Sequence, residues 1–339
     1  MNQAVIEQQP MSEAARAVTG IDLRRSWREV RSGIAKLVVH HPRRLAVLVG
    51  LISLNVLMPV RLLGFLNRRY SFIHSLFLGY PASDRFAKHF GFEFMIRKLK
   101  WRTAIYGVFV QGGKLGLLML TSTTERQFTR RENSAKLARL REDMERMQTL
   151  VGAKELRFAG VLPHYIARGT SSAPAAETSD RIAELLVDAY VRVCSALGTS
   201  VVPAILLGGR GAIGTRLAAR LVGRGVPVHI VDKKAPRECG EGWPDHLHGQ
   251  VAVVIDVARK GARAEYAGRF WKELCYLNET YPEPHGESLQ QMKKLGMRVW
   301  HVVGVRGHAF PPFPYAYRGG VPCCAMHTNH AEVLIRELG

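Results

Sequence analysis

VVPAILLGGRGAIGTRLAARLVGRGVPVHIVD, residues 201–232, has the most specific sequence pattern in the chain. Its first part, 201–207, is a short apolar run typical of a buried strand, although Pro203 fits poorly inside one. The run leads directly into glycines that match G-x-G-x-x-G, at Gly209, Gly211 and Gly214. A helical pattern and a second predicted strand follow in order, so we interpret the stretch as a βαβ unit rather than a chance glycine-rich turn.

Each part of this unit has a physical task in holding the diphosphate of a dinucleotide. The first glycine permits a tight turn, the second lets backbone N–H groups approach the diphosphate, and the third lets the helix pack close to its strand. The helix N-terminus adds partial positive charge. The second strand, 226–231, ends at Asp232, which is 23 residues after Gly209 and suits a ribose hydroxyl. The predicted cofactor-binding residues are Gly209, Arg210, Gly211, Ala212, Ile213, Gly214, Asp232 and Lys233.

The same residues bear on the choice of cofactor. The Asp232 carboxylate favours NAD, because it would repel the 2′-phosphate of NADP. Basic residues directly after it act in the opposite direction and could attract that phosphate: Lys233, Lys234 and Arg237. We therefore expect NAD or NADP, with NAD preferred.

The alternation of strands and helices extends on both sides of this unit. Further strands are predicted at 115–120, 155–162, 251–257, 274–278 and 297–303, and helices from about 132, 178 and 288 and near the C-terminus. The predicted fold class is α/β: a Rossmann-type doubly wound sheet with an additional α/β lobe and a helical, apolar N-terminal region. The expected domains are a basic, membrane-associating region at 1–102, an α/β substrate lobe with a connecting helix at 103–198, and the nucleotide-binding domain at 199–339.

The most apolar run is LAVLVGLISLNVLMPVRLLGFL, residues 45–66. Its length would allow a single transmembrane helix. Asn55, Pro59 and Arg61 lie inside it and basic residues flank both ends, which favours a helix in the membrane interface or a bent re-entrant one. The alternative is that this run and the aromatic-rich stretch 70–80 after it are both buried core helices of a soluble domain.

The net charge of the chain restricts the classes of partner that it can bind. The formal net charge is +20, and residues 1–105 hold 17 Lys/Arg against 6 Asp/Glu. This excess indicates an anionic partner: a membrane surface, an acidic carrier protein or nucleic acid. No nucleic-acid-binding motif is evident, so nucleic acid is the least favoured. The five cysteines are irregularly spaced, which suggests a reducing, cytoplasmic setting. Together with the apolar, basic N-terminal region, this predicts a peripheral or monotopic protein on the inner face of the cell membrane.

Hydride transfer to a carbonyl needs a proton donor, or a thiol where the substrate is a thioester. Loops 256–260, 279–287 and 304–324 follow predicted strands and are expected to wall the site. The catalytic candidates there are Cys323, Cys324, His308 and Tyr281. The two cysteines precede the predicted C-terminal helix, and we expect the N-terminus of that helix to lower the pKa of their thiols. Other proton-donor candidates are Glu279, Glu283, Tyr315, Tyr317, His164 and Tyr165. Cys324, His327 and His330 recur at every third residue, but such spacing drifts around a helix, so no metal site is predicted.

The order of parts from about residue 115 resembles the shikimate-dehydrogenase-like dehydrogenases, and in particular the long-chain acyl-carrier-protein reductases. The matching stretches are GLLMLTSTT, AKELRFAGVLPHYI, AILLGGRGAIGTRLAARL, LCYLNETYPEP and HAEVLIREL. The resemblance implies a nicotinamide cofactor and an acyl substrate. In those reductases a cysteine that carries the acyl group precedes the final A-E, whereas Asn329 occupies that position here and Cys323 and Cys324 are the nearest thiols.

These observations together predict an NAD(P)-dependent oxidoreductase that acts on a lipid-derived or acyl carbonyl compound at a membrane surface. The alternative is a non-catalytic nucleotide-binding sensor or scaffold, because no catalytic dyad is evident in the sequence.

Overall fold

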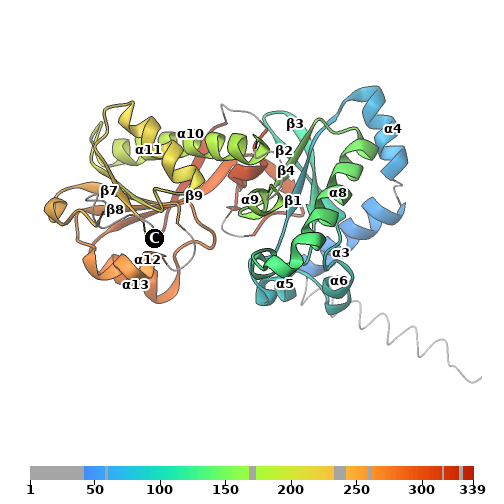
Figure 1. Ribbon diagram of the computed structural model, residues 1–339, viewed down its shortest axis with the longest axis horizontal. Coiled ribbons are helices and arrows are strands. Elements are labelled where there is room, and N and C mark those ends of the chain that lie inside the picture. The colour runs from blue at the N-terminus through green and yellow to red at the C-terminus, as the bar shows by residue number, and fades with distance from the viewer. Residues whose placement is uncertain are drawn as a thin grey trace, which may run out of the picture. The chain divides into compact units, whose positions relative to one another are not determined.

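The computed structural model describes residues 42–57, 60–167, 173–232, 242–258, 262–314, 317–327 and 331–339. The chain divides into two units, residues 1–46 and 47–339. Of the first unit, only the beginning of one helix is described. The second unit is a mixed α/β structure with two mixed sheets of mostly parallel strands (Figure 1).

One sheet contains the glycine-rich unit. Its strands lie in the order β11-β9-β8-β7-β5-β6, with β12 paired to β9. The five strands β5 to β9 are parallel, and β11 and β12 are antiparallel to β9. Their bounds are β5 Ala204–Leu207, β6 Val228–Val231, β7 Ala252–Asp256, β8 Leu274–Asn278, β9 Arg298–Arg306, β11 Gly320–Val321 and β12 Val333–Glu337. The strands predicted in this half are confirmed, and β5 begins directly after Pro203, which cannot donate a ladder hydrogen bond.

The other sheet has the order β10-β2-β3-β1-β4. Its strands are β1 Ile73–Gly79, β2 Ala104–Gln111, β3 Lys114–Leu120, β4 Glu155–Phe158 and β10 His308–Phe310. β1 pairs in parallel with both β3 and β4, so this lobe begins before residue 103 and includes part of the predicted 1–102 region. β10 follows β9 after a single residue, Gly307, and joins the edge of this sheet next to β2.

Helices cover and connect the sheets. The longest are α8 Ser134–Val151 and α10 Ala173–Ala196. Gly152 ends α8 with a φ of 71°, a left-handed conformation that glycine adopts without strain. The others are α5 Asp84–Phe90, α6 Glu93–Lys98, α7 Glu125–Phe128, α9 Leu162–Ile166, α11 Ala212–Val222, α12 Ala262–Tyr266 and α13 Gly286–Lys294, with 3-10 turns at Arg131–Asn133, Asp245–Leu247, Ala267–Arg269 and Cys323–Ala325.

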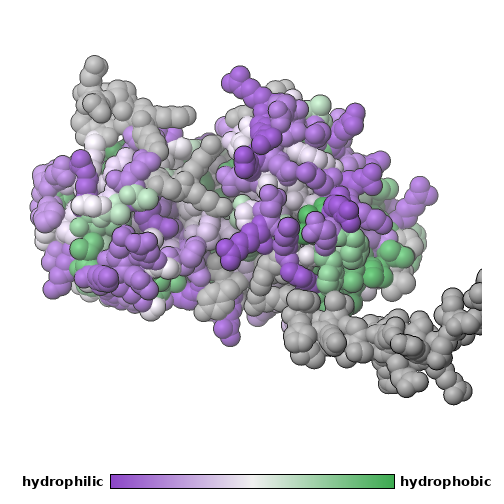
Figure 2. All heavy atoms as spheres, turned by 90° about the horizontal axis from the view of Figure 1, so that it is seen from below, coloured by the Kyte–Doolittle hydropathy of each residue, from purple (hydrophilic) through white to green (hydrophobic). Residues whose placement is uncertain are grey.

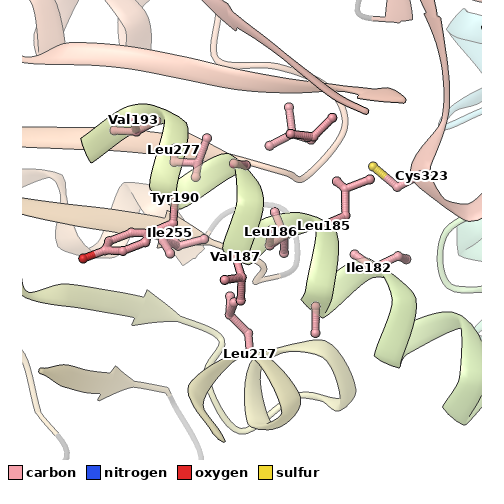
Figure 3. Packing of buried hydrophobic residues seen from close by; sticks show 14 of the residues in the cluster. Ile182, Leu185, Leu186, Val187, Tyr190, Val193, Leu217, Ile255, Leu277 and Cys323 are labelled. Atoms are coloured by element: carbon pink, nitrogen blue, oxygen red, sulfur yellow. The ribbon is translucent and has the colours of Figure 1, made fainter. Parts of the chain in front are cut away.

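Helix α10 forms the core on one face of the glycine-unit sheet. Its apolar side recurs at spacings of three and four and includes Ile182, Leu186 and Val193, all buried. These side chains pack between Leu217 of α11 and strand residues such as Leu277 (Figure 3). Cys323 belongs to the same cluster at its other end. The connecting helix is therefore a structural part of the core that fixes α11 and the Cys323 turn.

The apolar run 45–66 forms two helices rather than one. α3 Pro42–Ile52 passes into a π-helical turn, Ser53–Leu57, and α4 Val60–Tyr70 follows. Among the described residues, no single helix is long and apolar enough to cross a bilayer. The pair Arg44–Val56 and Val60–Tyr70 passes that test of length and composition together, and it is bent by 78°.

Two asparagines tie this helix pair to the sheet beside it. Asn55 donates to the carbonyl of Ile105 and accepts from the Ile105 N–H at 3.1 Å. Asn67, which is 2% exposed, accepts from the Ile73 N–H at 2.6 Å and donates to the carbonyls of Val151 and Gly152. Asn55, inside the apolar run, therefore pairs backbone groups in β2, and Asn67, just after the run, pairs those at the start of β1 and at the end of α8.

Replacing Asn67 by leucine is expected to lower the free energy of unfolding by about 3 kcal/mol, because each buried backbone group left unpaired costs roughly 1–3 kcal/mol. Urea unfolding of the full chain measures the change. Arg68→Ala serves as control, since its exposed side chain makes one long bond, 3.3 Å, to the Leu150 carbonyl. A loss for Asn67→Leu no larger than that of the control would contradict this account of the buried network.

The closing helix predicted near the C-terminus is wrong, because residues 333–337 form strand β12, antiparallel to β9. Its run Val333-Leu334-Ile335 is short and rich in β-branched residues, and periodicity alone does not separate helix from strand over so few positions. Pairing with β9 satisfies its backbone groups and decides the outcome. Cys323 and Cys324 therefore do not precede an α-helix; they begin a 3-10 turn of three residues.

Candidate functional site

The glycine-rich turn after β5 leads into α11, and its left-handed residue is Gly208 rather than Gly209, where the sequence predicts the tight turn. Gly208 has a φ of +80°, and Gly211 lies just before the first residue of α11 with no side-chain cap on the helix. A Cβ on Gly214 would lie 2.4 Å from the Gly208 oxygen and 2.6 Å from the Gly209 Cα. Both are backbone atoms that cannot move aside. The turn is therefore a close-packed cradle whose first helical amides lack intrahelical partners.

Asp232 lies beside this cradle, as predicted. It directly follows β6, and its Oδ2 accepts a hydrogen bond of 3.1 Å from the backbone N–H of Arg210. The carboxylate therefore lies at the glycine turn, in the position where it can meet a ribose that a bound diphosphate would place there. Lys233, Lys234 and Arg237 lie outside the described residues, so the preference between NAD and NADP stays a prediction.

A mostly apolar cavity of about 370 Å³ lies at the carboxyl ends of strands from both sheets. From the glycine-unit sheet it is lined by Ile213 at the start of α11, Ala258 after β7 and Glu279 after β8. From the other sheet it is lined by residues that follow β1 and β4, including Tyr80 and Gly160. The glycine turn and the cavity thus meet at Ile213. Of the three loops predicted as walls, each contributes lining residues.

Glu279 is the chemically most distinctive group in this cavity. Its carboxylate makes no hydrogen bond or ion pair with any described residue, and burial among apolar side chains raises its pKa to about 7. The negative charge of Asp256 adds to this effect. A lone carboxyl group that titrates near neutral pH in a cavity is typical of a general acid or base. The sequence included Glu279 among several proton-donor candidates without distinguishing it.

Asp256 supports the position of Glu279. Tyr276 donates a hydrogen bond to its Oδ2, the Ala258 N–H donates to Oδ1 at 3.0 Å, and the Glu279 N–H donates to its backbone oxygen at 3.1 Å. Burial raises the pKa of Asp256, while these side-chain and backbone donors act in the opposite direction. The residue therefore joins the ends of β7 and β8 and holds the base of the Glu279 loop.

The two cysteine candidates line the cavity but are not activated thiols. Cys323 and Cys324 begin a three-residue 3-10 turn, too short to supply a helix dipole. Burial raises the pKa of Cys323 well above that of a free thiol and that of Cys324 to about 11, and the nearby Glu279 carboxylate adds to both effects. The expectation that a helix N-terminus lowers their pKa is wrong, and both are protonated thiols at neutral pH.

A buried polar network holds this turn in place. His327 Nε2 lies 2.6 Å from Ser75 Oγ in β1, and the His327 N–H donates to Gln111 Oε1 in β2 at 2.7 Å. Burial lowers the pKa of His327 to about 4, so its ring is neutral. Ser75, Gln111 and His327 are all buried, which makes the network a structural link between the turn and the sheet that contains β1 and β2. No group of three or more potential metal ligands is found among the described residues, and His330 lies outside them.

The remaining candidates divide by location. Tyr281 lines the cavity, where its ring stacks on Tyr317 with centroids 5.6 Å apart, and burial raises its pKa to about 12. Glu283 pairs with Arg336 instead of facing the cavity alone. His308 is exposed on β10 and does not line the cavity. His164 and Tyr165 do not line it either, and Tyr315 lies outside the described residues.

The site therefore combines a close-packed glycine turn with an adjacent acid, an apolar cavity at the same sheet edge, and one unpaired carboxyl group with a pKa near neutral. In comparisons with known proteins, no family model matches the chain and no curated protein is significantly similar to it.

Proposed function

We propose that the chain is an NAD(P)-dependent oxidoreductase that interconverts an apolar carbonyl compound and its alcohol, with Glu279 as the group that transfers the proton. The observation that carries this proposal is the convergence of the glycine cradle and the Glu279 carboxyl on one apolar cavity. The order β6-β5-β7-β8-β9 of five parallel strands supports it, since doubly wound sheets bind nucleotides at the point where the strand order reverses, which here lies between β5 and β7.

The residues of the cradle fit a dinucleotide. Gly208 and Gly214 leave no room for side chains, so a diphosphate can approach the backbone amides that begin α11. Asp232 is placed to accept hydrogen bonds from ribose hydroxyls, and its charge favours NAD over NADP. The cofactor would supply the hydride that the side chains of the chain cannot provide.

Within the cavity, the chain's own groups supply the proton and the environment. With a pKa of about 7, Glu279 is protonated in about half of the molecules at neutral pH. In the reducing direction, its carboxyl donates a proton to the carbonyl oxygen as the carbon accepts hydride, which yields an alcohol and a carboxylate. In the oxidising direction, the carboxylate accepts the hydroxyl proton. The apolar wall excludes water and selects an apolar substrate.

Thermal unfolding of the full chain tests nucleotide binding. NADH at one hundred times its dissociation constant is expected to stabilise the protein by roughly 2.7 kcal/mol. Asp232→Ala is expected to weaken binding about tenfold, which corresponds to about 1.4 kcal/mol. Asp245→Ala is the matched control, because that aspartate is exposed and pairs with Arg269 rather than with the glycine turn. If neither NADH nor NADPH shifts the transition, the oxidoreductase proposal falls.

A measurement of turnover distinguishes the enzyme from the alternative, a non-catalytic nucleotide-binding sensor or scaffold. A sensor would show the nucleotide-dependent stabilisation but no oxidation of NADH with any of a series of long-chain aldehydes and ketones. The unpaired carboxyl of Glu279 favours the enzyme, because a purely structural cavity would not retain a group whose ionisation destabilises it.

A further inference from the structure

The helices of the apolar run present two different faces. On the inner side, Val47 is buried, and a Cβ on Gly50 would lie 2.3 Å from the backbone oxygen of Tyr106. On the outer side, Val49, Ile52 and Val56 recur at spacings of three and four and are exposed by 50%, 45% and 71%. The outer stripe is therefore an apolar helix face that no other described part of the chain covers.

The stripe continues on the neighbouring helices. On α4, Leu62 and Phe65 are exposed by 51% and 63%, whereas Leu63 and Gly64 between them are buried. On α6, Phe94 is 48% exposed and stacks on Phe92. We refer to Val49, Ile52, Val56, Leu62, Phe65 and Phe94 as the outer apolar face. Figure 2 shows hydrophobic residues gathered at the end of the molecule where α3 and α6 lie in Figure 1.

Positive charge accompanies this face. Residues 60–105 contain nine Lys/Arg and two Asp/Glu. Exposed basic residues lie on the same helices or just after them: Arg61, Arg68, Arg69, Arg97, Lys98, Lys100 and Arg102. A protein partner would have to match an apolar stripe and a dense basic border at once, whereas a bilayer with anionic headgroups offers both.

We propose that the outer apolar face docks the protein on an anionic lipid bilayer, with its side chains at the acyl boundary and the arginines at the headgroups. Two signals, apolar and electrostatic, are what stable interfacial binding requires. The two helices are bent by 78°, and the inner side of the pair packs on the sheet. This arrangement suits helices that lie on a membrane surface rather than cross it.

The same elements form one wall of the cavity. Val47 of α3, Ala87 of α5, and Met95 and Ile96 of α6 line it. Docking through these elements places the cavity's apolar wall next to the bilayer, where an apolar carbonyl compound is concentrated. This second step, the delivery of substrate through the wall of α3, α5 and α6, rests on the proposed function; the docking itself does not.

Co-sedimentation of the full chain with vesicles tests the docking, without nucleotide. We expect binding to vesicles of phosphatidylcholine with phosphatidylglycerol, and weak binding to phosphatidylcholine alone. Val56→Asp should lower partitioning by about tenfold or more. Arg61→Gln with Arg69→Gln, which replaces the exposed arginines four residues before and after Phe65, should lower it about fivefold for each arginine. Val222→Asp is the matched control, because this valine is 60% exposed at the end of α11.

Amide hydrogen exchange locates the contact. Vesicles should slow exchange in residues 47–57, 60–70 and 93–98 and leave α11 unchanged. Equal binding by wild type and Val56→Asp, or protection confined to residues outside these ranges, would overturn the proposal. Because nucleotide binding is measured by thermal unfolding without vesicles, failure of the docking and failure of the oxidoreductase proposal are distinguishable.

Discussion

Gly214→Ala is expected to lower the free energy of unfolding by about 3 kcal/mol and to abolish stabilisation by nucleotide. The new Cβ would lie 2.4 Å from the Gly208 oxygen and 2.6 Å from the Gly209 Cα. Because the obstructing atoms are backbone rather than the end of a flexible side chain, the first turn of α11 has to move away from β5. That movement opens the cradle on which a diphosphate would lie.

Urea unfolding and the NADH-dependent shift of the melting temperature measure the two effects. Gly268→Ala is the control, since a Cβ there meets no atom within 4 Å and its φ is not positive. If Gly214→Ala is too unstable to purify, Gly211→Ala takes its place, because its Cβ would lie 3.2 Å from the Gly208 oxygen and would crowd the turn without breaking it. Normal nucleotide binding by both variants would show that the turn is structural only.

The glycine unit could be predicted from the sequence because its determinants are local. Gly209, Gly211 and Gly214 lie within six residues, and the contact that requires Gly214 is with the turn just before it. The adjacent strands β5 and β7 are largely apolar and fully buried, as in parallel sheets that are covered on both faces. Sequence periodicity and spacing therefore contain the information that forms this part.

Five strands were not predicted, namely β1, β2, β10, β11 and β12, and two of them show why. β1 and β12 are short apolar segments whose character as strands depends on partners elsewhere in the chain: β3 and β4 for β1, and β9 for β12. Their local patterns suit a helix nearly as well. The missed β1 also explains why the lobe was predicted to begin at residue 103, whereas its sheet includes residues 73–79.

The candidate site was predicted at the level of loops but not of residues. Glu279 and Glu283 lie four residues apart in one predicted wall, and only the fold shows that Arg336, 53 residues further on, pairs with Glu283 and leaves Glu279 alone. The sequence predicts activated thiols at Cys323 and Cys324 because it predicts a helix after them. In the structure the segment predicted as a helix is strand β12, and burial raises the pKa of both thiols.

Glu279→Gln is expected to change stability in a way that depends on pH. The pKa of Glu279 is raised from 4.5 in the unfolded chain to about 7 in the folded one. Well below pH 4.5 the carboxyl is protonated in the folded and the unfolded state, so it does not change the free energy of unfolding. As pH rises towards 7, the unfolded state loses the proton first, so stability falls, and above pH 7 the full destabilisation is on the order of 3 kcal/mol. Glutamine is neutral at every pH and removes this loss.

The measurement is urea unfolding of wild type and Glu279→Gln between pH 4 and pH 9. The variant should match wild type at pH 4 and be more stable by about 3 kcal/mol at pH 8. Glu287→Gln, an exposed glutamate in the first turn of α13, should give no such difference. A difference between Glu279→Gln and wild type that stays constant over this range would mean that the carboxyl is solvated, and its role as proton donor would fall.

The same substitution should act on turnover in the opposite sense. An amide cannot donate a proton to a developing alkoxide, so hydride transfer to a carbonyl substrate should slow by about 10²–10⁴-fold. Gained stability together with lost turnover is the combination expected of a group kept for chemistry at the expense of the fold. If stability rises while turnover is unchanged, Glu279 is a buried charge without a catalytic part, and Tyr281, which lines the same cavity, becomes the next proton donor to test by Tyr281→Phe.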